Sequence, residues 1–240
     1  MKGLSIIIPV LRERQNLKKL ISITHNSVKK IKNFEIIIVD DDSNDGSIEL
    51  LKKLTFKFKK LKFIIRKKKP RDLCKSCTLG FTKSRYNNIV VMDGDLQHRP
   101  QEINKLYSVF LKKNCDFVVG SRNLFKKKNK GLKFYRLVTS IFLIIAVNIL
   151  LNFKTSDPMS GFFIFKKKIY LKNRKFLFNR GYKILLDLIY SSKKKLKILD
   201  INIDFRSRGE GNSKINYKII YFLMLIIIKK FFLRVSNIFN

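Results

Sequence analysis

Two aspartates stand one residue apart, Asp93 and Asp95, directly after the apolar run NIVVM. Carboxylates are scarce in this chain, which has 17 acidic residues against 53 lysines and arginines. Two carboxylates that flank a glycine, here Gly94, can converge on one divalent cation, and Mg²⁺ or Mn²⁺ prefers such hard oxygen ligands. The side-chain carbonyl of Gln97 offers a further ligand. The stretch therefore predicts a cation site, which a phosphate-bearing ligand would complete.

Two acidic runs begin like the calcium-binding loop of an EF-hand, but neither keeps the pattern. That loop needs glycine at its sixth position and glutamate at its twelfth. Counting from Asp93, these positions hold His98 and Asn104. Counting from Asp41, the twelfth position holds Lys52. The sequence therefore does not predict an EF-hand.

The formal net charge is +36, and such a charge attracts nucleic acid, a phospholipid surface or phosphorylated ligands. AT-biased codon usage would give the same excess of lysine in an ordinary protein, so the charge alone does not choose among these partners. A nucleic-acid-binding protein should interleave basic residues with exposed aromatics or carry a reader motif. Phenylalanine and tyrosine are scattered mainly through apolar segments here, and no reader motif is found. We therefore expect no nucleic-acid partner.

The three cysteines, Cys74, Cys77 and Cys115, are too few for a disulfide framework, which indicates a reducing compartment. The CKSC spacing of the first two lacks the second pair of cysteines or histidines that a zinc site needs. The N-terminal apolar run is too short for a signal peptide and meets charge at Arg12. We therefore expect the protein to start in the cytoplasm.

Short apolar runs alternate with helical patterns in the first half of the chain. Continuous apolar strands separated by helices predict a mostly parallel sheet covered on both faces. The expected strands are Leu4–Val10, Phe34–Asp40, 61–66, 87–93 and 116–122, and the expected helices carry Leu17, Leu20, Ile21 and Val28, then the run SIELLKKL, then residues 101–112. Ligands bind such sheets beyond the carboxyl ends of the strands, where the acidic residues of this chain gather.

Two long apolar stretches lie in the second half, residues 134–153 and the C-terminal residues 215–240. Spanning a bilayer takes about 20 predominantly apolar residues, so both are borderline. A helix lying in the membrane interface fits as well, and so does a buried core helix. Both stretches lie among lysines and arginines, which favours contact with an anionic cytoplasmic leaflet.

Six motifs together resemble the polyprenyl-phosphate glycosyltransferases of glycosyltransferase family two, the relatives of dolichyl-phosphate mannose synthase. They are SIIIPVLRERQNL, EIIIVDDDSNDGS, VVMDGDLQHRPQEI, DFVVGSR, DPMSGFFIF and FRSRGEGNSK, in the order of the family, over about residues 4–214. The resemblance implies an α/β fold of the GT-A type, which is Rossmann-like, with a mostly parallel sheet flanked by helices. It implies one such domain over residues 1–214, including the apolar segment 134–153, and a C-terminal interfacial or membrane-associated helix over 215–240.

The resemblance also implies a role for individual residues. Donor binding falls to Pro9, Leu11, Glu13, Val39, Asp41, Asp93, Gly94, Asp95, Arg122, Arg208 and Lys214. The catalytic set is Asp93, Asp95, Arg122, Arg208 and Lys214, with Asp93, Asp95 and Gln97 holding Mg²⁺ or Mn²⁺. Asp157, Ser160 and Gly161 fall on the acceptor side. The glycines Gly209 and Gly211 suit residues 206–214 to act as a lid that orders over the donor.

The chain departs from the family in three places. Leu11 and Arg12 stand where the family often has tyrosine and asparagine. Asp42 replaces a usual glycine, which calls for a turn conformation that aspartate tolerates. The segment KPRDLCKSCTLGF stands where many members have a glycine-rich loop.

The resemblance implies inverting transfer of a sugar from a nucleotide-diphosphate sugar to a polyprenyl or dolichyl phosphate. GDP-mannose is the favoured donor, and the expected place is the cytoplasmic face of the membrane, held peripherally or monotopically, with a membrane-anchoring partner subunit left open. The alternatives are a UDP-glucose or other UDP-hexose donor, a cell-surface glycan glycosyltransferase and, more distantly, a basic nucleic-acid-binding protein. A membrane scaffold without activity would lack the cation ligands, and these are present.

Overall fold

A computed structural model of the chain describes residues 1–122, 147, 154–204 and 217–236. One seven-stranded sheet runs through it in the order β3-β2-β1-β4-β6-β5-β7. The strands are β1 (Leu4–Val10), β2 (Phe34–Asp40), β3 (Leu61–Ile65), β4 (Asn88–Val91), β5 (Phe117–Arg122), β6 (Phe163–Lys166) and β7 (Ile198–Ile203). The helices are α1 (Arg14–Val28), α2 (Ser47–Lys57), α3 (Leu73–Lys83), α4 (Glu102–Lys112), α6 (Lys167–Asn173), α7 (Ile184–Tyr190) and α8 (Tyr217–Ser236), with a 3₁₀ turn at Arg174–Phe176.

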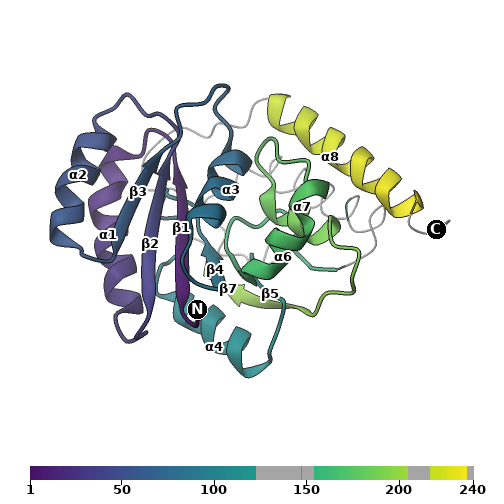
Figure 1. The fold of residues 1–240 in the computed structure, drawn as a ribbon, viewed down its shortest axis with the longest axis horizontal. Helices are drawn as coiled ribbons and strands as arrows, with labels where there is room; N and C mark the ends of the chain where they lie inside the picture. Colours follow the sequence, from purple (N-terminus) through teal and green to yellow (C-terminus); the bar gives the residue numbers. More distant parts are fainter. Residues whose placement is uncertain (123–146, 148–153, 205–216, 237–240) are drawn as a thin grey trace.

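The sheet is covered by helices on both faces, as the sequence predicts (Figure 1). Alternate residues of a strand point to opposite faces, so Ile6 and Ile8 of β1 pack with α1, α2 and α4, while Ile7 packs with α3, α6 and α7. Every residue of β1 and β2 is buried for this reason. Two-sided burial explains why both strands are continuous apolar runs and why the predicted bounds of both are confirmed.

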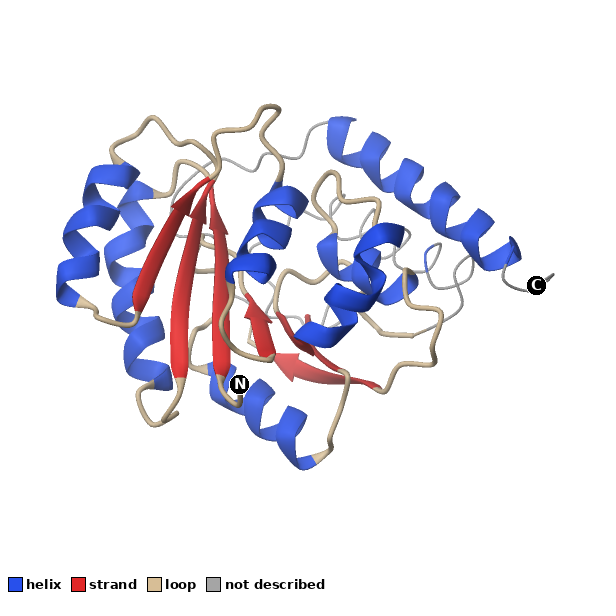
Figure 2. Cartoon of the chain, viewed as in Figure 1, coloured by secondary structure: helices blue, strands red, loops and turns tan. Residues whose placement is uncertain are grey.

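One strand of the sheet, whose strands are drawn red in Figure 2, runs antiparallel to both of its neighbours. The strand β6 lies between β4 and β5 and pairs antiparallel with both of them. Its first residue, Phe163, is paired with Val91 at the carboxyl end of β4 and with Val119 in the middle of β5. The segment that precedes β6 consequently arrives at the same edge as the residues that follow β4.

The two cysteines of the CKSC run lie inside the helix α3 and are fully buried. Burial raises the pKa of both thiols, so they stay protonated and unreactive. All three cysteines are free. Cys74 and Cys77 pack with Ile7 and Phe81 between α3 and the sheet, which gives them a structural place in the core.

The C-terminal helix α8 lies beside α7 (Figure 1). No helix among the residues that the structure describes is both long enough and apolar enough to cross a membrane. The predicted apolar segment 134–153 lies outside the described residues except for Val147, which is fully buried.

Candidate active site

The candidate site lies where β1 and β4 end side by side. The two strands are parallel neighbours, with Ile7 paired to Val91, so their carboxyl ends share one edge. From β1 the chain continues to β2 on one side of the sheet, while β4 leads to β5 and β6 on the other side. Such a point of reversal leaves a crevice between the diverging loops, and ligands of open α/β sheets bind there. The Asp93-Gly94-Asp95 turn follows β4 at this position.

Two glycines bring the Asp93 carboxylate into place. A Cβ atom on Gly94 would lie 2.7 Å from Cγ1 of Val10, at the end of β1. A Cβ atom on Gly161 would lie 2.1 Å from Oδ2 of Asp93. Neither position therefore tolerates a side chain unless its neighbours shift. The backbone of the DPMSG segment, predicted for the acceptor side, thus lies against the carboxylate predicted for the cation.

His98 is a residue of this edge that the sequence did not assign to the site. Its side chain is 2% exposed, its Nε2 lies 3.5 Å from Oδ2 of Asp93, and its ring packs 5.2 Å from that of Phe162. His98 therefore buttresses Asp93 from inside the protein. A histidine three residues after the second aspartate was the available signal, but its burial depends on β6.

The two aspartates differ in exposure. The Asp93 side chain is 38% exposed, whereas Asp95 is 7% exposed. The backbone N–H of Gln97 donates to Oδ1 of Asp95 at 3.1 Å, and between them Leu96 takes a left-handed φ of 61°. A positive φ is unusual for leucine and marks a tightly held turn. The turn fixes the direction of the Asp95 carboxylate.

The residues predicted for the acceptor side are held from behind. Asp157 and Ser160 are 1% and 3% exposed, and the Ser160 hydroxyl donates to the carbonyl of Gly120 in β5 at 2.7 Å. Asp200 of β7 accepts from the Thr155 hydroxyl and from the Ser156 N–H, both at 2.6 Å. These bonds fasten the segment to β5 and β7. The backbone of Gly161 lies against the Asp93 carboxylate.

The predicted nucleoside-side residues surround the ends of β1 and β2. Pro9 and Val39 are paired across the two strands, and both are buried. Glu13 lies directly before α1, where its carboxylate accepts from the Asn16 side chain at 2.8 Å. Leu11 is half-buried in the connecting loop. The structure thus brings all four to one edge.

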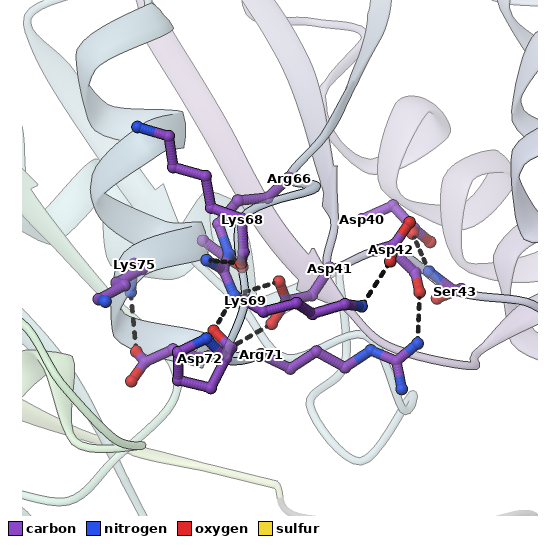
Figure 3. A network of polar contacts seen from close by, with 12 residues as sticks. Asp40, Asp41, Asp42, Ser43, Arg66, Lys68, Lys69, Arg71, Asp72 and Lys75 are labelled. Carbon is purple, nitrogen blue, oxygen red and sulfur yellow. Dashed lines mark hydrogen bonds and ion pairs between the residues drawn. The ribbon is translucent and has the colours of Figure 1, made fainter.

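Asp41 reaches a network rather than open solvent (Figure 3). One carboxylate oxygen pairs with the guanidinium of Arg66, and the other accepts the backbone N–H of Asp72 at 2.6 Å. Burial raises the pKa of the Asp41 carboxyl, while the Asp72 N–H and Arg66 oppose that rise. Arg66, 6% exposed, also donates to the carbonyls of Lys68 at 2.6 Å and Pro70 at 2.8 Å. The pair therefore shapes the loop that joins β3 to α3.

The loop between β3 and α3 presents positive charge. Lys67, Lys68 and Lys69 are exposed, and Lys69 pairs with Asp42. Arg71 donates to the Asp42 carbonyl at 2.7 Å. Asp42 has a φ of 61°, so the turn conformation predicted from its replacement of glycine is confirmed.

Three predicted basic residues cannot be placed by their side chains. The backbone of Arg122 ends β5 at the carboxyl edge, next to Ser121, and its side chain lies outside the described part of the chain. Arg208, Lys214 and the predicted lid 206–214 lie outside the described residues. Their roles stay predictions.

The edge offers hard oxygen ligands for a divalent cation but not a complete protein cage. Among the described residues, no group of three or more His, Cys, Asp and Glu side chains is placed to hold a metal ion. Mg²⁺ and related cations are commonly held by one or two carboxylates together with substrate phosphates. Asp93, partly exposed beside the nearly buried Asp95, fits that kind of shared site.

Comparison with known proteins identifies relatives over most of the chain. The family model described as Glycosyl transferase family 2 matches residues 5–173. A dolichol-phosphate mannosyltransferase of Pyrococcus furiosus is 34% identical over 90% of this chain, and the chain spans 60% of that relative's length. A protein of the same name from Mycosarcoma maydis is 32% identical over 90% of this chain and 75% of its own length.

A solved structure shares the fold. Glucosyl-3-phosphoglycerate synthase from Mycobacterium tuberculosis, in complex with Mn²⁺, UDP-glucose and phosphoglyceric acid, superposes with a TM-score of 0.72. The alignment covers 96% of this chain and 80% of that structure at 13% identity. At this identity the likeness concerns the fold alone.

The buried carboxylate of Asp40 gives a test of the electrostatics at this edge. Asp40 is 0% exposed; its Oδ1 accepts the Ser43 N–H at 2.7 Å, and its Oδ2 has no hydrogen-bond partner among the described residues. Burial raises the pKa of Asp40, with the Ser43 N–H opposing. A raised carboxyl pKa contributes stability at low pH that is lost as pH rises through the folded-state pKa. Asp40→Asn should therefore remove the part of the wild type's loss of stability that sets in as pH rises above the ordinary aspartate pKa, measured by urea unfolding.

Asp42→Asn is the matched control. The ion pair with Lys69 lowers the pKa of the exposed Asp42, so its contribution is present above its unfolded-state pKa and is lost as pH falls. Relative to the wild type, the free energy of unfolding of Asp40→Asn should therefore increase as pH rises, whereas that of Asp42→Asn should decrease as pH rises. Parallel curves for Asp40→Asn and the wild type would show that Asp40 ionises without cost.

Proposed function

We propose that this chain, which belongs to glycosyl transferase family 2, transfers a sugar from a nucleotide-diphosphate sugar to the phosphate of a polyprenol, with GDP-mannose as the donor. One observation carries the proposal: Asp93 and Asp95 stand at the point of reversal of the sheet, with the Asp93 carboxylate against Gly161. The names of the relatives, dolichol-phosphate mannosyltransferase, support a dolichyl or polyprenyl phosphate as acceptor.

Different residues along this edge of the sheet would bind the cation, the nucleoside and the phosphates of the donor. Asp93, Asp95 and Gln97 would hold a divalent cation, Mg²⁺ or Mn²⁺, against the donor diphosphate. The cation would supply positive charge that stabilises the departing diphosphate. Pro9, Leu11, Glu13, Val39 and Asp41 would line the nucleoside end, and Arg122, Arg208 and Lys214 would contact the phosphates.

The acceptor makes a strong general base unnecessary. A phosphomonoester has a second pKa near about 6, so a lipid phosphate is already an anionic nucleophile at neutral pH. The protein then has to hold the two reactants in line, because attack from the face opposite the leaving diphosphate inverts the anomeric carbon. The rigid segment ahead of β6, fastened by Asp200 and Ser160, would provide a fixed wall on the acceptor side.

The same proposal places the protein at the cytoplasmic face of a membrane, held peripherally. An acceptor with a polyprenyl tail stays in the bilayer, so the active site has to lie at the membrane surface, next to the lipid phosphate. A net charge of +36 favours an anionic leaflet, and α8 exposes large apolar side chains such as Met224 and Phe232.

The test is transfer of radiolabelled sugar into lipid that organic solvent extracts. Membranes supplied with polyprenyl phosphate would receive GDP-mannose or UDP-glucose, each with Mg²⁺ or with EDTA. Label from GDP-mannose that enters the lipid only with the cation supports the proposal. Label from UDP-glucose alone would replace the proposed donor, and no label from either would contradict lipid glycosylation.

Asp95→Asn should lower the transfer rate by about 10²–10³-fold, because it removes a carboxylate charge that would hold the cation against the departing diphosphate, while asparagine Oδ1 can still accept the Gln97 N–H. Initial rates at saturating donor would measure the loss. Asp116→Asn is the control: its carboxylate pairs with Lys166 and lies directly before β5, at the opposite edge of the sheet, so this variant should keep the wild-type rate. Equal rates for both variants would remove Asp95 from the mechanism.

Gly161→Ala should weaken Mn²⁺ binding about 10- to 100-fold in the presence of nucleoside diphosphate, because its Cβ would displace the Asp93 carboxylate. Calorimetric titration measures the affinity. Gly80→Ala is the matched control, since its Cβ would also crowd, at 2.5 Å, but against Ile7 in the core. Both variants should lose stability, whereas only Gly161→Ala should lose the cation; unchanged affinity in Gly161→Ala would separate Gly161 from the cation site.

A further inference from the structure

The helix α8 carries a lysine that points inward. The side chains of Lys230 and of Asp187 in α7 are both 0% exposed, and the Lys230 ammonium lies 2.7 Å from the Asp187 carboxylate. The same Nζ donates to the Ser191 hydroxyl at 2.6 Å and to the Phe176 carbonyl at 3.0 Å. Its three N–H groups thus have three acceptors, which is what a buried ammonium requires. Its neighbour Lys229 is exposed.

Asp187 carries the contact onward to the loop before α7. Its Oδ1 accepts the Phe178 N–H at 2.9 Å, and its Oδ2 accepts the Asn179 N–H at 2.7 Å. Asn179 in turn accepts from the Thr78 hydroxyl of α3 at 3.1 Å. One ion pair therefore joins α8, α7 and the loop 177–183 into a single unit.

The loop reaches the nucleoside end of the candidate site. The Gly181 N–H donates to Asp72 at 2.7 Å, and the backbone N–H of Asp72 is the group that Asp41 holds. A Cβ on Gly181 would lie 2.9 Å from Cβ of Phe222, so α8 packs directly on this glycine. The helix thus touches the loop beside Asp41 at Gly181 and is anchored about two turns further along at Lys230.

The opposite side of α8 is apolar and exposed. Tyr221, Met224, Ile228, Phe231 and Phe232 are between 41% and 66% exposed. They recur at i, i+3, i+7, i+10 and i+11, which is the spacing of one helix face. The inward side holds Ile226, Ile227 and Lys230. An apolar outer face on a strongly basic chain suits an anionic lipid surface.

The buried pair specifies a register that apolar packing alone would leave loose. Isoleucine side chains can slide along an apolar surface and find similar contacts one turn away. The Lys230 ammonium cannot, because a shift of one turn, about 5.4 Å, would leave it buried without its acceptors and would leave Asp187 without its counter-charge. Burial lowers the pKa of Lys230 and Asp187 opposes that shift, as expected for an ammonium kept charged only by its partner.

We propose that Lys230 is a positioning residue: it locks α8 in one register, so that the outer face, inserted in an anionic bilayer, holds the donor edge at a fixed height above the lipid phosphates. The inference rests on the proposed function, since that function puts the acceptor in the bilayer. The lock itself is a property of the fold and can be measured without sugar transfer.

The direct test is the distance between two spin labels on protein bound to vesicles of phosphatidylcholine and phosphatidylserine. Labels would sit at Met224→Cys in α8 and Lys52→Cys in α2, both exposed positions, while the native cysteines are buried. The otherwise wild-type chain should give one narrow distance distribution, and Lys230→Met should broaden it. Lys229→Met, which removes the same charge one residue away, should leave it narrow. A narrow distribution in Lys230→Met would overturn the proposal.

A second variant distinguishes the loss of the register from misfolding caused by the unpaired Asp187 charge. Asp187→Asn combined with Lys230→Met removes both buried charges, so it should fold, yet it also lacks the ammonium that specifies the register. It should show the same broadening as the single variant. Wild-type narrowness in the double variant would mean that apolar packing sets the register.

Activity then tests the consequence. Lys230→Met should lose at least about ten-fold in transfer to polyprenyl phosphate in vesicles, and stay within about two-fold of wild type with a short-chain, water-soluble prenyl phosphate. Vesicle binding should be unchanged, because the outer face is intact. An equal loss on both acceptors, or a parallel loss of vesicle binding, would contradict a positioning role. A wild type inactive on both acceptors would contradict the proposed function, while the distance measurement would still decide the lock.

Discussion

The contact between the Asp93 carboxylate and the backbone of Gly161 is the constraint on which the site depends. It requires a residue without a side chain at 161, and it requires the antiparallel strand β6 to enter the sheet between β4 and β5. Only then do a segment that follows β4 and a segment that precedes β6, almost seventy residues apart in the chain, meet at one edge. Gly94 plays the matching part by letting the turn after β4 pack against the end of β1.

Two buried basic side chains, each paired with an aspartate, connect the elements around that edge. Arg66 joins Asp41 to the loop between β3 and α3, and Lys230 joins α8 to Asp187. Burying a charge is costly unless its partners are in place, so each pair tolerates few arrangements of the elements that it connects. The two networks meet at Asp72, which binds Asp41 through its N–H and Gly181 through its carboxylate. The nucleoside end and the C-terminal helix are thereby parts of one structure.

The sequence predicted what depends on local pattern and missed what depends on distant partners. The bounds of β1 and β2 were readable because two-sided burial makes them continuous apolar runs. The place of β6 was not, since a four-residue apolar run does not reveal its direction or neighbours. The sequence did not single out His98 or Lys230 for the same reason. In a chain rich in lysine, the rotation of α8 about its axis, set by what it packs against, decides that Lys230 rather than Lys229 faces inward. The described residues that follow β1, β2 and β4 did meet at one edge, because the carboxyl ends of parallel strands share it.

The central claim is that this edge binds a nucleoside diphosphate together with a divalent cation. Calorimetric titration of the wild-type chain with GDP and with UDP, in Mn²⁺ and in EDTA, tests it most directly and needs no acceptor. The account predicts saturable binding of one nucleotide with Mn²⁺ and its loss in EDTA. Equal binding with and without the cation, or no binding of either nucleotide by the folded protein, would contradict it.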